Sequence, residues 1–86
     1  MERIARVAIR TPDGYVWGKE QPMRHHDLIH DLSEEGYSAA DVSDQGFMTD
    51  SGRFVDRSEG LRIAIEAGQI VKKNGNENEL YSEDMW

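Results

Sequence analysis

The sequence has no cysteine, only two prolines and no long run of apolar residues. Without cysteine there is no disulfide framework, no thiolate metal site and no thiol nucleophile, a composition that fits a reducing compartment. A membrane-spanning helix needs about 18 or more consecutive apolar residues, and a signal peptide needs a shorter apolar core. The sequence offers neither, so we expect a cytoplasmic protein without a membrane partner.

The chain is also short. The chain has 86 residues, enough for one small domain. A domain of this size buries only about 60–65% of its unfolded surface, so its core is thin and a deep, enclosed active site is not expected within one subunit. We therefore expect a homo-oligomer.

Positive charge is scarce, because 10 Lys and Arg residues stand against 17 Asp and Glu, for a net charge of −7. The imbalance is concentrated in residues 27–60, which hold nine acids and two arginines. Binding to duplex nucleic acid depends on Lys and Arg releasing counterions from phosphates, so this charge argues against a duplex partner. Clustered carboxylates could instead occupy a basic groove on another protein.

The hydrophobic pattern predicts an α+β fold. Residues 3–19 alternate around a Thr-Pro-Asp-Gly turn and predict one hairpin, and residues 46–55 predict a second. Apolar residues at helical spacing predict helices over 23–35 and from Asp56 to Gly68, with 37–45 as a loop. We expect about four antiparallel strands with both helices on one face, in a domain spanning 1–73. Residues 74–86 are expected to form a polar linker and a docking C-terminal tail.

All three histidines lie close together at the start of the first predicted helix, in the run Arg24-His25-His26-Asp27-Leu28-Ile29-His30. Arg24 and His25 would stand at the helix N-terminus, where backbone N–H groups and the helix dipole favour a phosphate. Alternatively, His25 is a hydrogen-bonded, partly buried imidazole. His26 and His30 have the i, i+4 spacing of metal ligands, but solvated residues on the helix flank are the simpler interpretation.

Two further segments carry candidate binding residues. Arg53 and Arg57 are the only cations in the acidic middle, where they could contact a ligand or pair with neighbouring carboxylates. Tyr81 and Trp86 offer large aromatic surfaces that could stack on a base or dock on the protein itself. Ser82, Glu83 and Asp84 are expected to cap or hydrogen-bond locally, or to hold a ribose hydroxyl if the tail borders a site. No catalytic triad, paired carboxylates or phosphate-binding loop is recognisable, so we expect no cofactor and no metal.

These segments resemble a family of small proteins found in phages and in prophage-bearing bacteria. The resemblance rests on Arg24-His25-His26-Asp27, on Gly46-Phe47-Met48-Thr49 with Gly52-Arg53-Phe54-Val55-Asp56-Arg57, and on Leu80-Tyr81-Ser82-Glu83-Asp84-Met85-Trp86. It covers most of the chain from Pro22 onward, with Gly60 and Met85 as departures from the family pattern. The resemblance implies that the segments belong to one recurring pattern, and a setting in which small phage proteins act against host defence.

Three functional hypotheses follow. The first is a protein that binds a phosphorylated or nucleotide ligand and sequesters a host defence signal. Its ligand-binding residues would be Arg24, His25, His26, Arg53, Arg57, Tyr81 and Trp86. The second is an acidic protein that inhibits a host effector by direct contact and needs no small ligand. The third is a small hydrolase that uses histidine as a general base.

Overall fold

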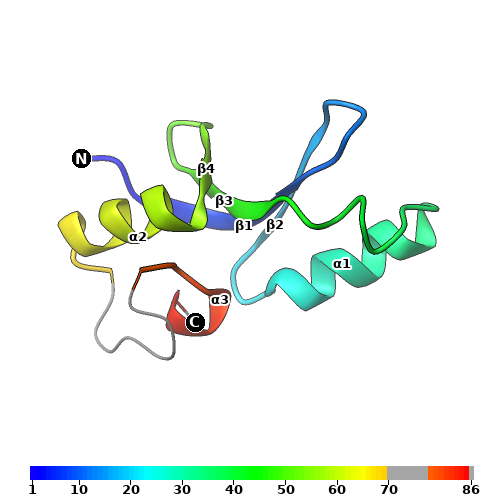
Figure 1. Ribbon diagram of the computed structural model, residues 1–86. Coiled ribbons are helices and arrows are strands. Elements are labelled where there is room, and N and C mark those ends of the chain that lie inside the picture. Colours follow the sequence, from blue (N-terminus) through cyan, green and yellow to red (C-terminus); the bar gives the residue numbers. More distant parts are fainter. Residues whose placement is uncertain (70–77, 86) are drawn as a thin grey trace.

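The computed structural model describes residues 1–69 and 78–85, and it has the predicted α+β architecture (Figure 1). The elements in chain order are β1 (Ile4–Arg10), β2 (Val16–Glu20), α1 (His25–Glu34), β3 (Gln45–Thr49), β4 (Phe54–Asp56), α2 (Arg57–Glu66) and α3 (Ser82–Met85). Among the described residues, no helix has both the length and the apolar character needed to cross a membrane.

The two predicted hairpins join into one antiparallel sheet with the strand order β2-β1-β3-β4. The first hairpin turns at Gly14, whose φ of 93° suits glycine and few other residues. The hairpins meet through β1 and β3, where Val7 lies opposite Phe47. This places the first strand of the chain in the middle of the sheet.

Both helices cover the same face of the sheet, as predicted. Val7, Phe47 and Val55 lie side by side on neighbouring strands and therefore share a face. A Cβ atom on Gly60 of α2 would lie 3.2 Å from the Phe47 ring, so α2 packs closely on this face. At α1, the Lys19 ammonium from β2 pairs with Asp31 at 2.6 Å on the same side.

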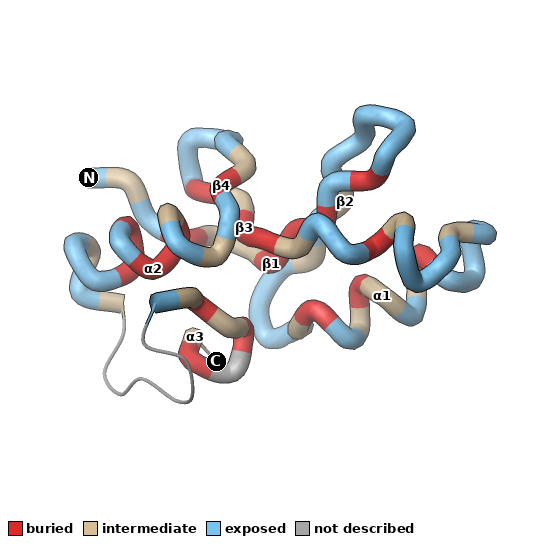
Figure 2. Tube along the Cα trace, viewed as in Figure 1, coloured by how far each residue is buried: buried red, intermediate tan, exposed pale blue. Residues whose placement is uncertain are grey.

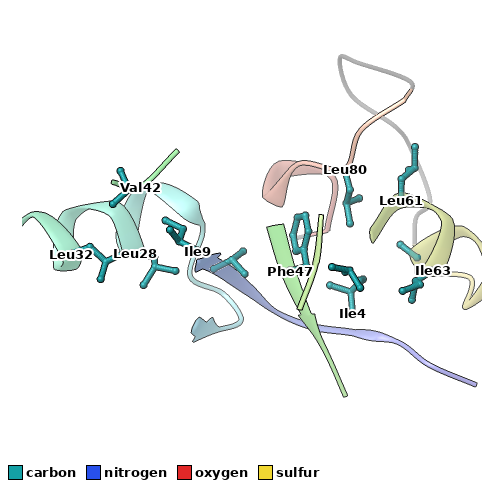
Figure 3. Close-up of a cluster of buried hydrophobic side chains, with 12 residues drawn as sticks. Ile4, Ile9, Leu28, Leu32, Val42, Phe47, Leu61, Ile63 and Leu80 are labelled. Atoms are coloured by element: carbon teal, nitrogen blue, oxygen red, sulfur yellow. The ribbon is translucent and has the colours of Figure 1, made fainter. Parts of the chain in front are cut away.

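The core runs along this face in one continuous cluster (Figure 3). Under α1, Ile9 lies with Leu28, Leu32 and Val42, whereas Phe47 lies nearer to Leu80 from the C-terminal segment. Phe47 and Leu80 have no exposed surface. Buried and exposed residues alternate along α1 and α2, as expected for helices with one face against a sheet (Figure 2).

The second helix begins where its capping signal predicts. Asp56 is the N-cap residue of α2, and its carboxylate accepts a hydrogen bond from the Glu59 backbone N–H at 2.8 Å. The first helix starts two residues later than predicted, because Arg24 has an extended backbone and forms the N-cap. These starts place Arg57 and His25 at the first position of their helices.

Candidate functional site

The N-terminus of α1 already holds a carboxylate of the protein. The Asp27 side chain accepts a hydrogen bond from the Arg24 backbone N–H at 2.8 Å and lies 3.5 Å from the His26 Nε2 atom. An acidic side chain in the first turn interacts favourably with the helix dipole. It also occupies part of the position that an external phosphate would take, so Arg24 and His26 are placed beside a negative group.

His25 is buried, with only 5% of its surface exposed, and it links three segments of the chain. Its Nε2 atom lies 2.7 Å from the Gly46 carbonyl oxygen. A carbonyl can only accept, so Nε2 carries the proton and donates it. Nδ1 is then an acceptor for the Ser82 hydroxyl at 3.3 Å, and the same Ser82 oxygen accepts from the His25 backbone N–H at 3.4 Å. The ring also packs edge to face on Phe47. This is the hydrogen-bonded imidazole that the sequence analysis gave as the alternative to a ligand contact.

Arg57 holds the C-terminal segment against the sheet. Its guanidinium donates to the Leu80 carbonyl oxygen and to the Gln45 side-chain oxygen, each at 2.7 Å. Its Cζ atom lies 4.5 Å from the centre of the Tyr81 ring, which is the geometry of a cation–π contact. The Leu80 backbone N–H donates a hydrogen bond to the Arg57 carbonyl oxygen at 3.0 Å. Arg57 and Tyr81 are therefore neighbours, and both are engaged by the protein.

Arg53 lies at the other end of β4, in the turn after β3. Its guanidinium donates two hydrogen bonds to Glu2, at 2.7 and 3.2 Å. Hydrogen bonds from Arg53, Thr49 and Ser51 lower the pKa of the Glu2 carboxyl from 4.5 to about 2. The expected pairing of Arg53 with a carboxylate is observed, although its partner lies 51 positions away in the sequence.

The three histidines do not gather at one point. His26 and His30 are exposed, and each lies near a carboxylate of its own helix, Asp27 and Glu34 respectively. Within residues 1–69 and 78–85, no group of three or more histidine and acidic side chains is arranged to hold a metal ion. This finding concerns the described part of the chain only.

The structure thus brings together some of the predicted ligand-binding residues and separates others. His25, Arg57 and Tyr81 meet around the C-terminal segment, Arg24 and His26 lie at the adjacent end of α1, and Arg53 lies elsewhere. Trp86 lies outside the described residues. Ser82 was expected to bond locally, and the structure also places its hydroxyl 3.3 Å from the His25 Nδ1 atom, 57 positions away. Asp84 does bond locally, by accepting from the Tyr81 backbone N–H at 2.9 Å.

A hollow next to Arg57 has the wrong charge for a phosphate. It measures about 250 Å³, and its lining includes Asp44, Asp56 and Glu79 together with Arg57. Three carboxylates against one guanidinium repel an anion. The hollow is therefore unsuited to a phosphate. His25 and Arg57 instead hold the C-terminal segment, through Ser82 and the Leu80 carbonyl oxygen respectively.

A second hollow, of about 370 Å³, lies between β2 and α1. Its floor is apolar, with Trp17, Leu28 and Leu32. Its polar lining consists of Lys19, Asp31, Glu34 and Glu35, which carry a net charge of −2. None of these four polar residues is among the ligand-binding residues predicted from the sequence. The signal that could have found this hollow was the acidic excess of residues 27–60.

The comparisons with known proteins give one match. The family model described as "Phage T4 y16D protein" matches residues 3–86. No curated protein and no solved structure matches the chain.

Proposed function

The chain belongs to the phage T4 y16D protein family, and from this premise we propose that it binds a basic surface of a host protein through its acidic face. This was the second hypothesis from the sequence. The observation that carries it is the hollow between β2 and α1, where an apolar floor is bordered by exposed carboxylates. Interfaces of this kind combine a desolvated apolar centre with a charged rim that steers the partner.

The carboxylates at this rim face solvent, although Asp31 pairs with Lys19 and Glu34 lies 3.1 Å from the His30 Nε2 atom. The side chain of Glu34 is 70% exposed and that of Asp31 is 47% exposed. Glu35 is exposed at the end of the same helix. Ion pairs of exposed groups contribute little to folding, so these carboxylates are not needed for stability. They supply a negative field toward which a Lys- or Arg-rich surface is attracted.

A phosphorylated or nucleotide ligand is the second candidate. It is supported by the meeting of His25, Arg57 and Tyr81 around one segment. Against it, His25 and Arg57 donate hydrogen bonds to backbone carbonyl oxygens of the protein itself, and the adjoining hollow is acidic. The hydrolase hypothesis is weaker still, because both ring nitrogens of His25 contact protein atoms.

The proposal can be tested by capture and charge substitution. Host-cell lysate is passed over the immobilised protein, the captured proteins are identified and purified, and their affinities are measured at two salt concentrations. We expect a partner whose affinity falls about tenfold or more when Asp31, Glu34 and Glu35 are replaced by Asn, Gln and Gln, and which weakens with added salt.

The matched control removes the same charge elsewhere, through Asp50→Asn, Glu59→Gln and Glu66→Gln. Equal loss of affinity in both variants would show a general charge effect and would contradict binding at the hollow. A thermal-shift panel of nucleotides tests the second candidate, because a ligand of the folded state raises the melting temperature. The second candidate would be favoured if a nucleotide raises the melting temperature and if this increase is the same in the variant with Asp31, Glu34 and Glu35 substituted.

A further inference from the structure

Within residues 1–69 and 78–85, the outer edge of β2 has no neighbouring strand, because β2 is the first strand in the sheet order. The pairing of the first hairpin shows which backbone groups point outward. The Thr11 N–H bonds to the Tyr15 carbonyl oxygen at 2.9 Å, and bonded pairs then alternate along the ladder. Trp17 and Lys19 consequently bond to β1, whereas the N–H groups of Val16, Gly18 and Glu20 point away from the sheet.

The centre of this edge is formed by Gly18. Gly18 has no side chain, and a Cβ atom there would meet Arg6, which lies over the opposite face of the sheet. The strand itself is short and alternates between exposed and half-buried residues. An extended segment can therefore approach the backbone closely along Val16 and Gly18, whereas the Glu20 carbonyl oxygen already accepts a hydrogen bond from the Met23 N–H at 3.0 Å.

The acidic hollow lies directly beside this edge, since Trp17, Gly18 and Lys19 from β2 form one of its walls. Side chains of Trp17 and Lys19 point to the helix-covered face, so residues of an added strand that lie opposite them would point into the hollow. A Lys or Arg side chain opposite Trp17 could lay its apolar stem along Leu28 and Leu32 and bring its charge to Glu34 and Glu35. The position opposite Lys19 is less suited to a cation, because Lys19 already pairs with Asp31 at 2.6 Å.

We propose that the outer edge of β2 accepts an extended segment of the partner protein as a fifth, antiparallel strand, with a basic residue opposite Trp17. This inference rests on the proposed function and identifies the form of its partner. Antiparallel addition continues the pairing of the whole sheet and gives the stronger ladder. Backbone hydrogen bonds would provide affinity, and the hollow would select the basic side chains.

A second copy of the chain is a poorer occupant of this edge. Two β2 strands paired about Gly18 would bring two α1 helices side by side. Each carries Asp31, Glu34 and Glu35 next to the contact, so like charges would face each other. Charge complementarity therefore favours a basic segment.

The probe is a seven-residue peptide of alternating Lys and Val with blocked ends. In the proposed register, each Val lies opposite Val16, Gly18 or Glu20 and directs its N–H to β2, whereas each Lys directs its N–H to solvent. Two matched peptides carry N-methyl groups, one on the Val residues and the other on the Lys residues. Both retain the same side chains and charge. Affinity is measured by titration, and the contact is located from the amide chemical shifts of the labelled protein.

We expect Val methylation to weaken binding at least about tenfold and Lys methylation to change it by less than about threefold. The amide signals of Val16, Gly18 and Glu20 should shift on binding. Equal affinity of the two methylated peptides would overturn strand addition and leave the proposed acidic surface intact. Absence of binding by all three peptides, with no charge-dependent partner from the lysate, would overturn the proposed function as well.

A protein variant gives an independent check. Val16→Pro removes an outward N–H from an edge position, where proline is tolerated, and should weaken the unmodified peptide. Val16→Pro could instead convert a dimer of this protein into monomers without changing the affinity for the peptide. In that case the edge pairs two copies of this chain and the inference is wrong.

Discussion

Replacing His25 by Ala should destabilise the fold strongly, because the ring links α1 to β3 and to the C-terminal segment. The change leaves the Gly46 carbonyl oxygen without its 2.7 Å donor, which costs about 1–3 kcal/mol when the group is buried. It also removes the edge-to-face contact with Phe47, worth about 0.5–1.5 kcal/mol beyond area burial. Together we expect a loss of about 2–4 kcal/mol, a large part of the total stability of a small domain.

Urea unfolding followed by circular dichroism measures this loss directly. For a domain of this size it corresponds to a fall of about 10–25 °C in melting temperature. His25→Phe keeps the ring but leaves the carbonyl unbonded, so the difference between the two variants separates packing from hydrogen bonding. His26→Ala is the control, since its side chain is 72% exposed and its loss should change stability by less than about 0.5 kcal/mol. If His25→Ala were as mild as His26→Ala, the imidazole would not hold these segments together.

Three further predictions concern acid stability, the sheet and the C-terminal segment. Glu2→Gln should flatten the fall in stability between pH 4.5 and 2. Because the pKa of Glu2 is lowered from 4.5 to about 2 in the folded protein, its contribution to the free energy of unfolding is complete above pH 4.5 and is lost as the pH falls to about 2. Urea titrations at a series of pH values measure this free energy, and the same dependence on pH in the wild-type protein and the variant would contradict the prediction. Gly46→Ala should disrupt the β3–β4 pair, since its Cβ would collide with the Val55 backbone. Gly18→Ala should cost less, because its Cβ would meet the flexible Arg6 side chain and would lie 3.3 Å from the Val7 carbonyl oxygen; equal melting temperatures of the two variants would refute the difference. Leu80→Ala should cost about 2–5 kcal/mol and expose the tail to protease, while Ile65→Ala at an exposed position should cost little; similar digestion rates would argue against a docked Leu80.

The elements whose signals are local could be predicted from the sequence. Asp56 with Glu59 indicates the start of α2, and the Thr-Pro-Asp-Gly turn indicates the first hairpin; both are present. These signals work because the bonds that define a cap or a turn join residues only a few positions apart. The fold class follows from them together with the apolar periodicity.

The contacts that define the candidate sites could not be predicted in this way. Arg53 pairs with Glu2 because β1 of the first hairpin lies beside β3 of the second. Ser82 contacts His25 because the C-terminal segment returns to α1. A single sequence carries no local mark of such pairs. The buried position of His25 was left open for the same reason: its helical face is readable, but the carbonyl of Gly46 that accepts its proton belongs to another element.

The docking of the C-terminal segment also matters during synthesis of the chain. A ribosome makes the protein from β1 onward, so the sheet and both long helices are complete before Leu80 is added. Until then Phe47 lacks one of its neighbours, and His25 lacks Ser82. A nascent chain that ends before Leu80 therefore presents an unfinished core to cellular proteases, and full resistance to degradation should begin only after this segment has left the exit tunnel.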